Sequence, residues 1–450
     1  MKKIFSIFAL ILAASTFVAC SNEEDDIFSQ SAAERLNAAS DLYSSRLTAQ
    51  PNGWAMQLYP TTQNKAPYGT GYLVLMRFHP NHQVDVAMNN LLTNNVYQSD
   101  SSVWDVITDD GPVLSFDTHN SVMHKFSDPD DVPQTGTSDD ANDETGTGIG
   151  GDFEYIIVDA PEDASYMMLK GKKRGTYNLL TPIEEGVDYQ EYLTDVNNFQ
   201  HTMFPTNEVA QDFIHFGDSV CVFAGASDGV PSIYAVGSDA VTTQSFNPFV
   251  ITKRGNDFYL RFRDARTFGD KSIQDYRYDT TADRFISVED SAYYIEGSDP
   301  YNFFVTSLDS LNDVWSFHQD GNASESFQTA YNTVNNQFRQ VNRRYSLRAI
   351  FLRQINGQTI LRFEYGASHN YADYNVNMTK NNDGTISLSY QGPANTGATN
   401  ILNRVSGIQT VIDMLTTGNL QVAAGTTRFD LSTIKLTSVN EPNNWIVFGM

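Results

Sequence analysis

Two glycine-rich segments match patterns that carry chemistry in other proteins. Residues 225–229 (Gly-Ala-Ser-Asp-Gly) match G-x-S-x-G, the turn that holds the nucleophilic serine of many hydrolases, and residues 146–151 match the phosphate-binding pattern G-x-G-x-x-G. A nucleophilic serine needs a strand before it and a helix after it, but here Pro231 and a strand-like run follow. The second match lies among carboxylates and leads into a strand, whereas phosphate binding requires a helix N-terminus. We therefore interpret both segments as turns and predict no catalytic residue from them.

Histidines and carboxylates form no spacing that would hold a metal ion. His79 and His82 lie close together, but they flank a turn with no further ligand nearby, and the chain has no H-E-x-x-H motif. Residues 127–151 form an acidic loop, yet its best EF-hand register, which starts at Asp140, places Thr145 where glycine is required. We expect a solvated, disordered loop there, with a weak calcium site as the alternative. The sequence predicts no metal and no cofactor.

Aromatic and basic residues supply the candidates for ligand binding. The four tryptophans of the chain could form a platform on which a sugar stacks, although tryptophan in an alternating strand usually packs in the core. The run Lys-Gly-Lys-Lys-Arg at residues 170–174 interrupts a strongly acidic chain. It is either a solvated turn or a contact for an anionic ligand or partner. The candidate ligand-binding residues are therefore Trp54, Trp104, Lys170, Lys172, Lys173 and Arg174.

The N-terminal residues have the pattern of a lipoprotein signal. Lys2 and Lys3 form a basic start, and residues 4–16 are an apolar run, shorter than the ~20 residues that a membrane-spanning helix needs. The sequence Phe17-Val18-Ala19-Cys20 resembles a lipobox, although leucine is usual at the position of Phe17. We predict a signal peptide over residues 1–19 and lipid attachment at Cys20, with an ordinary secreted protein as the alternative.

An acidic segment follows the cysteine and bears on where the protein is displayed. Residues 20–30 are predicted to be a lipidated, solvated tether. Placed directly after an acylated cysteine, its polar residues resemble the export signal of Bacteroidetes lipoproteins that reach the cell surface. The predicted location is the outer membrane, at the cell surface or on the periplasmic face. The residues of this export signal are Ser21, Asn22, Glu23, Glu24, Asp25 and Asp26.

The composition predicts a mainly β protein that does not bind nucleic acid. Phe and Tyr are abundant, many short runs alternate in polarity, and β-branched and aromatic residues favour strands. A net charge of −25 is unsuited to a phosphate backbone, which needs a basic face. With Cys20 acylated, Cys221 is the remaining thiol and no intramolecular disulfide can form. We expect Cys221 in the core, a reactive thiol being the alternative.

The first folded region, residues 31–202, is predicted to be a helix followed by a meander of strands. Residues 31–47 have apolar side chains at three- and four-residue spacing, and Ser31 and Glu34 match a capping box. Eight short strands behind one helix favour a lipocalin-like up-and-down barrel, with a two-sheet sandwich as the alternative. Alternating polarity and turn residues place these antiparallel strands at Trp54–Tyr59, Gly71–Phe78, Gln83–Met88, Tyr97–Ile107, Pro112–Asp117, Phe153–Val158, Ser165–Leu169 and Gly175–Thr181.

A second β-rich region is predicted over residues 203–450, with a division into 203–317 and 318–450 as an alternative. A helix over residues 185–201 precedes it, and residues 249–262 and 276–288 have the pattern of hairpins. A further helix over residues 324–341 precedes a run of strands from Tyr345 to Met450. A helix followed by a meander therefore occurs twice, which suggests a duplication without a repeat at the level of single residues.

Several segments resemble one protein family. They are the lipobox with its acidic tail, S-A-A-E-R-L-N-A-A from residue 31, N-G-W at 52–54, L-S-F-D at 114–117, G-D-F-E-Y at 151–155 and L-K-G-K-K-R-G at 169–175. In these segments the chain looks like the uncharacterised Bacteroidetes lipoprotein family called domain of unknown function 4302, most strongly over residues 31–180. The resemblance implies an accessory role beside SusC/SusD-type outer-membrane uptake systems. It implies no catalytic residue.

The sequence therefore predicts a non-enzymatic binding or accessory lipoprotein of a nutrient-uptake system, with its ligand left open. The expected partners are the outer membrane, through the lipid anchor, and SusC/SusD-like proteins. One alternative is a structural or adhesive surface protein. The other is a hydrolase of glycans or peptides, whose acid and base carboxylates come together only in the fold. Their separation of ~5–10 Å is a tertiary property, so no pair can be chosen among 54 acidic residues.

Overall fold

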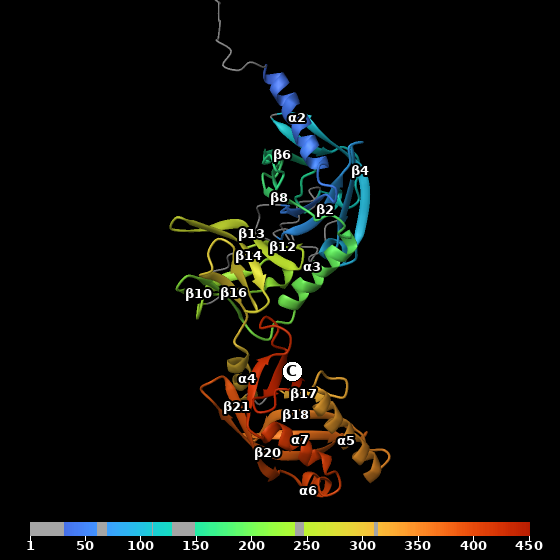
Figure 1. Cartoon of the computed structure of the whole chain (residues 1–450), viewed down its shortest axis with the longest axis vertical. Coiled ribbons are helices and arrows are strands. Elements are labelled where there is room, and N and C mark those ends of the chain that lie inside the picture. Colours follow the sequence, from blue (N-terminus) through green and yellow to red (C-terminus); the bar gives the residue numbers. More distant parts are fainter. Residues whose placement is uncertain (1–30, 61–69, 110, 128–148, 239–246, 310–313) are drawn as a thin grey trace, which may run out of the picture.

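The computed structural model of the chain is an elongated row of β-sheets flanked by helices (Figure 1). It describes residues 31–60, 70–109, 111–127, 149–238, 247–309 and 314–450. Within these residues, the strands form three antiparallel eight-stranded sheets, each made of strands consecutive in the chain. The predicted mainly β class is confirmed. We call the three parts the first unit (residues 31–182), the second unit (189–296) and the third unit (300–449).

The first unit is a helix followed by a closed barrel. Helix α2 (Ala32–Thr48) begins with the predicted capping box, in which Ser31 and Glu34 exchange hydrogen bonds between side chain and backbone. Strand β8 pairs with β1, which closes the sheet, so the barrel is confirmed and the sandwich is not formed. The strands are β1 (Trp54–Leu58), β2 (Tyr72–Phe78), β3 (Gln83–Met88), β4 (Gln98–Thr108), β5 (Pro112–Phe116), β6 (Glu154–Asp159), β7 (Met167–Gly171) and β8 (Tyr177–Pro182).

The second unit repeats this plan with one opening in the sheet. Helix α3 (Tyr189–Met203) is capped by Asp188, and β16 pairs with β9 as β8 pairs with β1. In the described residues no ladder joins β11 to β12, but Phe249 N donates to Gly229 O at 3.0 Å and Asn247 N donates to Pro231 O at 3.2 Å. The strands are β9 (Asp212–Phe216), β10 (Ser219–Ala224), β11 (Ser232–Ala235), β12 (Phe249–Arg254), β13 (Asp257–Phe268), β14 (Lys271–Asp279), β15 (Arg284–Ser287) and β16 (Tyr293–Glu296).

The third unit is again a helix and a closed barrel, with three more helices inserted. Helix α4 (Pro300–Asp309) precedes β17, and β17 pairs with β24. Helices α5 (Glu325–Val341), α6 (Thr396–Leu402) and α7 (Gly407–Thr416) lie between strands, and α5 packs on α7. The strands are β17 (Val314–His318), β18 (Leu347–Ile355), β19 (Gln358–Tyr365), β20 (Asn370–Lys380), β21 (Thr385–Pro393), β22 (Asn419–Ala424), β23 (Thr433–Ser438) and β24 (Trp445–Gly449).

A helix followed by an eight-stranded meander therefore occurs three times among the described residues, rather than twice. The third repeat starts at α4, not at the helix predicted over residues 324–341, because β17 lies before α5. The first and third units share a contact between helix and barrel. Trp54 on β1 donates its indole N–H to Leu47 O in α2 at 2.9 Å, and Trp315 on β17 donates to Ser307 Oγ in α4 at 3.0 Å.

Neighbouring units are joined mainly through side chains. The first and third barrels are closed, so they offer no strand edges for pairing with the second unit. Ala55 and Tyr59 point outward from β1 and share a hydrophobic core with α3 and with the sheet of the second unit. Strand β1 is consequently buried on both faces. At the other junction, Phe429 from the loop between β22 and β23 enters the same core, where its ring contacts Phe204 and Phe285.

Candidate functional site

A groove between the first and second units is the best candidate for a ligand site in the described residues. Its volume is about 620 Å³, within the ~300–1,000 Å³ that small-molecule sites usually have. One wall is the outer face of β1, β7 and β8 with the end of β6, and the other comes from β12, β13 and β14. The lining residues are Gln57, Asp159, Ser165, Tyr166, Met168, Leu179, Thr181, Thr252, Arg254, Tyr259, Arg261, Asp275 and Val288.

Buried polar side chains line part of this groove. Gln57 is only 3 % exposed, and its Oε1 atom has no hydrogen-bond partner in the protein. Thr181 and Thr252 are also buried and line the groove. A buried carbonyl without a donor costs roughly 1–3 kcal/mol. Because Gln57 Oε1 itself has almost no exposed surface, a ligand in the groove gains this hydrogen bond when the Gln57 side chain turns toward it.

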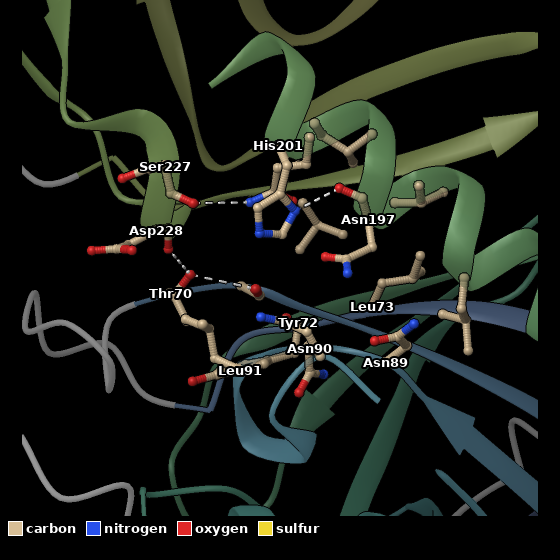
Figure 2. A pocket seen from close by; sticks show the side chains of 17 residues that line it. Thr70, Tyr72, Leu73, Asn89, Asn90, Leu91, Asn197, His201, Ser227 and Asp228 are labelled. Carbon is tan, nitrogen blue, oxygen red and sulfur yellow. Dashed lines mark hydrogen bonds between the residues drawn. The ribbon is translucent and has the colours of Figure 1, made fainter. Parts of the chain in front are cut away.

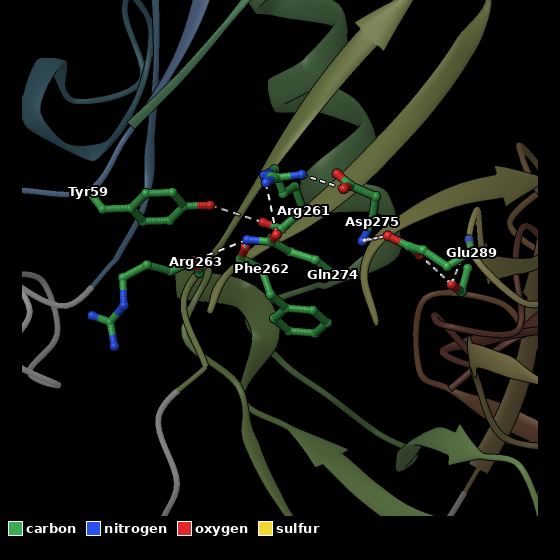
Figure 3. Close-up of polar contacts among 8 residues, drawn as sticks. Tyr59, Arg261, Phe262, Arg263, Gln274, Asp275 and Glu289 are labelled. Atoms are coloured by element: carbon green, nitrogen blue, oxygen red, sulfur yellow. Dashed lines mark hydrogen bonds and ion pairs between the residues drawn. The ribbon is translucent and has the colours of Figure 1, made fainter. Parts of the chain in front are cut away.

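An ion pair fixes the wall that the second unit provides. Figure 3 shows Tyr59 reaching from β1 to the backbone of β13, where its hydroxyl donates to Arg261 O at 3.0 Å. The Arg261 guanidinium pairs with Asp275 and donates to Gln274 Oε1 at 2.8 Å. Burial raises the pKa of Asp275, and the charge of Arg261 opposes this rise. Arg261 is therefore occupied within the wall.

Aromatic and apolar side chains alternate with the polar ones. The guanidinium carbon of Arg254 lies 5.1 Å from the centre of the Tyr259 ring, so this cation packs on an aromatic side chain of the same hairpin. On the facing wall, the Tyr166 hydroxyl donates to Asp159. Met168 and Leu179 provide apolar surface beside them. The groove can thus contact the apolar face of a ligand and accept hydrogen bonds from its polar edge.

The two predicted tryptophans lie inside the first barrel, not in the groove. Trp54 and Trp104 are 0 % and 1 % exposed, and both belong to the core of the first unit. The indole N–H of Trp104 donates to Gln83 O at 3.0 Å, and its ring contacts Phe78 edge-on. Both indoles are therefore packed and hydrogen-bonded as core residues, with no ring face open to solvent.

The basic run lies at the turn between β7 and β8, away from the tryptophans. Asp152 accepts hydrogen bonds from the backbone N–H groups of Lys173 and Arg174, each at 3.0 Å, and so fixes the turn. Lys172 forms ion pairs with Asp109 at 2.7 Å and with Glu154 at 3.0 Å. Lys170 packs over Tyr177. A hollow of about 400 Å³ adjoins this turn, but acidic side chains already engage part of its charge.

Comparison with known proteins places the chain in a family. A family model described as domain of unknown function (DUF4302) matches residues 24–280. The chain belongs to this family. The match covers the first unit and most of the second, and it includes every residue that lines the groove except Val288. No curated protein and no solved structure matches the chain.

In this DUF4302 member, the G-x-S-x-G segment forms a turn, as its sequence context predicts. Ala226–Asp228 make one short 3-10 helix between Gly225 and Gly229, both with positive φ, and β11 follows. Figure 2 shows this turn beside α3 and the first unit, where Thr70 donates to Asp228 O at 2.7 Å. The enclosed space there is about 70 Å³, which suits one or two waters rather than an organic ligand.

The remaining polar candidates of the DUF4302 chain are dispersed. His79 pairs with Asp85 at 2.7 Å and His82 lies 3.5 Å from Asp105, in separate contacts. Among the described residues, His, Cys, Asp and Glu form no group of three or more that could hold a metal ion. Cys221 is half-buried and packs at the edge of the second unit's core.

Several sequence predictions fall on residues that the structure does not describe. They are the signal peptide over residues 1–19, the lipid attachment at Cys20, the export signal over residues 21–26 and the acidic loop over residues 128–148. Across the described part of the chain, the helices are too short or too polar to cross a membrane. The groove itself was not predicted, because its residues come from seven strands of two units and no local pattern links them.

Proposed function

We propose that this DUF4302 protein is a surface-exposed outer-membrane lipoprotein that binds a nutrient, without catalysis, as an accessory component of an uptake system. The lipobox at Cys20 and the acidic residues after it support the anchor and the display at the surface. Two or more acyl chains hold a protein stably on a membrane, whereas one binds only marginally. The proposed partners are SusC/SusD-like proteins of the same membrane.

The groove is the observation that carries the binding role. Its volume suits a small ligand, and Gln57 Oε1 is an acceptor left unpaired in a buried wall. A buried acceptor without a partner is stabilised when a ligand supplies a donor. The core shared by the two units holds both walls in place, so that the site is formed before the ligand arrives.

A hydrolase is the second candidate function, because two carboxylates line the groove from opposite walls. Burial raises the pKa of Asp275, and a carboxyl with a raised pKa facing a second carboxylate is the arrangement of acid/base hydrolysis. We favour binding because Asp275 pairs with Arg261, which stabilises its charged form and opposes its use as a proton donor. Turnover of a glycan or peptide that Asp275→Asn abolishes would decide for the hydrolase.

A pull-down from native outer membranes tests the proposed function. The tagged full chain is extracted in mild detergent, and the proteins recovered with it are identified by mass spectrometry. We expect a SusC- or SusD-like partner in stoichiometric amount. Recovery of the chain alone would contradict the accessory role.

Two variants separate anchoring from display in the same cells. Cys20→Ala removes the proposed acylation site and should release the protein from the membrane fraction. Replacing the four acidic residues 23–26 with alanine should leave the protein anchored but protected from protease added to intact cells. Membrane retention of Cys20→Ala would refute lipid attachment at this cysteine.

A further inference from the structure

We propose that the groove between the first and second units binds a neutral saccharide. This inference rests on the proposed function, because it takes the groove as the ligand site. It names the chemistry of the ligand, which the proposed function leaves open. Three properties of the lining residues lead to it: acceptors that lack a donor, aromatic and apolar surface between them, and strand edges that are already paired or covered.

The walls of the groove combine acceptors that lack a donor with one guanidinium, that of Arg254, which packs on Tyr259. Gln57 Oε1 has no donor, and Asp159 receives one hydrogen bond from Tyr166 while its carboxylate has room for more. The strongest donor, Arg261, is engaged by Asp275 and Gln274. A ligand that fits this wall therefore brings several donors of its own, as the hydroxyl groups of a sugar do.

The charges of the groove favour a neutral ligand over an anion. Its lining includes two arginines, Arg254 and Arg261, and two aspartates, Asp159 and Asp275, so the formal charges balance. Carboxylate or phosphate ligands would meet the same carboxylates that accept a hydroxyl well. An anionic sugar or a phosphorylated compound is thus disfavoured relative to a neutral one.

The aromatic and apolar residues match the other face of a sugar ring. A pyranose presents C–H groups on one face and hydroxyls at its edge, so it binds where aromatic surface adjoins planar polar groups. Tyr259 and Tyr166 lie on opposite walls, with Met168 and Leu179 beside the latter. Arg254 over the Tyr259 ring adds a planar donor at the rim.

A peptide bound by strand addition fits less well. That mode of recognition needs an exposed sheet edge, where the backbone of the peptide can form hydrogen bonds. Strand β1 pairs with both β2 and β8, β8 with β7 and β1, and β13 with β12 and β14. Strand β12 also lines the groove and pairs only with β13, but its outer edge is covered at Lys253, whose backbone N–H and O both hydrogen-bond to the Tyr192 hydroxyl at 2.8 Å. The groove therefore offers mainly side chains, and side chains of the kinds present suit hydroxyl groups.

The test uses the full chain with and without a change at Gln57. Binding of soluble neutral oligosaccharides, their N-acetylated and amine forms, and their uronic acid forms is measured by calorimetry and by saturation-transfer NMR. The Gln57→Leu variant removes the unpaired acceptor and keeps the volume of the side chain. We expect the variant to be as stable as the natural chain or more stable, because a buried unpaired acceptor is lost. We expect its affinity for the neutral sugar to fall about tenfold.

Two further variants complete the design. Tyr259→Ala should weaken binding of the same sugar by about tenfold or more, since it removes aromatic surface from the groove. Tyr371→Ala changes an exposed tyrosine of the third unit, far along the chain from the groove, and should leave the affinity unchanged. Loss of sugar affinity in Gln57→Leu and Tyr259→Ala, with the melting temperature retained, would support the proposal.

The remaining outcomes separate this inference from the proposed function. If no sugar binds, but a polyamine or a lysine-rich peptide binds and Gln57→Leu abolishes that binding, the saccharide is refuted while the groove remains the ligand site. If a sugar binds equally well to both groove variants, the groove is refuted as its site. If nothing binds, yet the pull-down recovers an uptake partner, the saccharide inference fails and the accessory role stands.

Discussion

Replacing Phe429 with alanine should uncouple the third unit from the second. Phe429 is 4 % exposed and lies between the rings of Phe204 and Phe285, each with its centre 5.6 Å away. Truncation of a buried phenylalanine costs about 3–5 kcal/mol in unfolding free energy. Because this ring belongs to one unit and its pocket to the other, the cost falls mainly on their docking. That is a loss of roughly 100- to 1,000-fold or more in the docking equilibrium.

Polar contacts around the loop should weaken with the ring. Asp283 accepts hydrogen bonds from Thr427 Oγ1 and from Arg428 N, each at 2.7 Å, and Arg428 pairs with Glu296 at 2.9 Å. These contacts require the loop to remain inserted, and the inserted ring holds it there.

Calorimetry and limited proteolysis of the full chain measure this effect. We expect the natural chain to unfold its second and third units together, and Phe429→Ala to show a separate transition about 10 °C lower. Protease should also cut the variant between the two units, at residues 297–299. The same substitution at Phe153, which is 45 % exposed, is the control and should shift neither transition appreciably. Unchanged transitions and unchanged proteolysis in Phe429→Ala would refute the role of this ring.

Three further predictions concern single residues of the fold. Burial and the charge of Glu208 raise the pKa of Asp212 well above 3.8. The folded state therefore binds the proton of the Asp212 carboxyl more tightly than the unfolded state does. As a result, the free energy of unfolding falls as the pH rises from about 3.8 through the higher folded pKa. Asp212→Asn should therefore raise the melting temperature at pH 7 but not at pH 3, and an equal gain at both values, or in the exposed control Asp218→Asn, would contradict this cause. Trp54→Phe and Trp315→Phe each remove an indole N–H that donates to the preceding helix. Each variant should lose about 1–3 kcal/mol of unfolding free energy, measured by urea denaturation. A loss of stability in only one of the two variants would argue against an equivalent contact in the first and third units. Gly297→Ala would place a Cβ atom 2.0 Å from Arg428 O, so it should loosen the junction as Phe429→Ala does, and normal proteolysis of this variant would be evidence against so close an approach.

The first unit could be predicted from sequence because its signals are local. Each of its eight strands is short, is bounded by turn residues and overlaps a predicted segment, and β3 (Gln83–Met88) has the predicted bounds. The capping box of Ser31 and Glu34 is likewise a contact between residues three apart. Alternating polarity fails for β1, which is buried on both faces, since its outer side chains meet the second unit.

The helices of the third unit show where local signals are insufficient. Residues 345–450 were predicted as strands, yet α7 (Gly407–Thr416) is helical despite its glycine, valine and isoleucines. Helix propensity differs by less than about 1 kcal/mol among such residues, and packing against α5 outweighs it. Helix α4 (Pro300–Asp309) is rich in aromatic and β-branched residues, which favour strands in isolation. Both helices depend on partners distant in the chain.

The groove could not be predicted because it is a consequence of how the closed first barrel meets the sheet of the second unit. Ala55 and Gln57 on β1 and Tyr59 directly after it lie at alternate positions and point away from the barrel interior. Ala55 and Tyr59 enter the core shared with the second unit, and Gln57, between them, lines the groove. Since both neighbours of Gln57 are packed, the groove cannot open without exposing that core. Ligand binding should therefore use a preformed site. The hydrogen bonds of the Gln57 side chain should change on binding, whereas the packing between the first and second units should not.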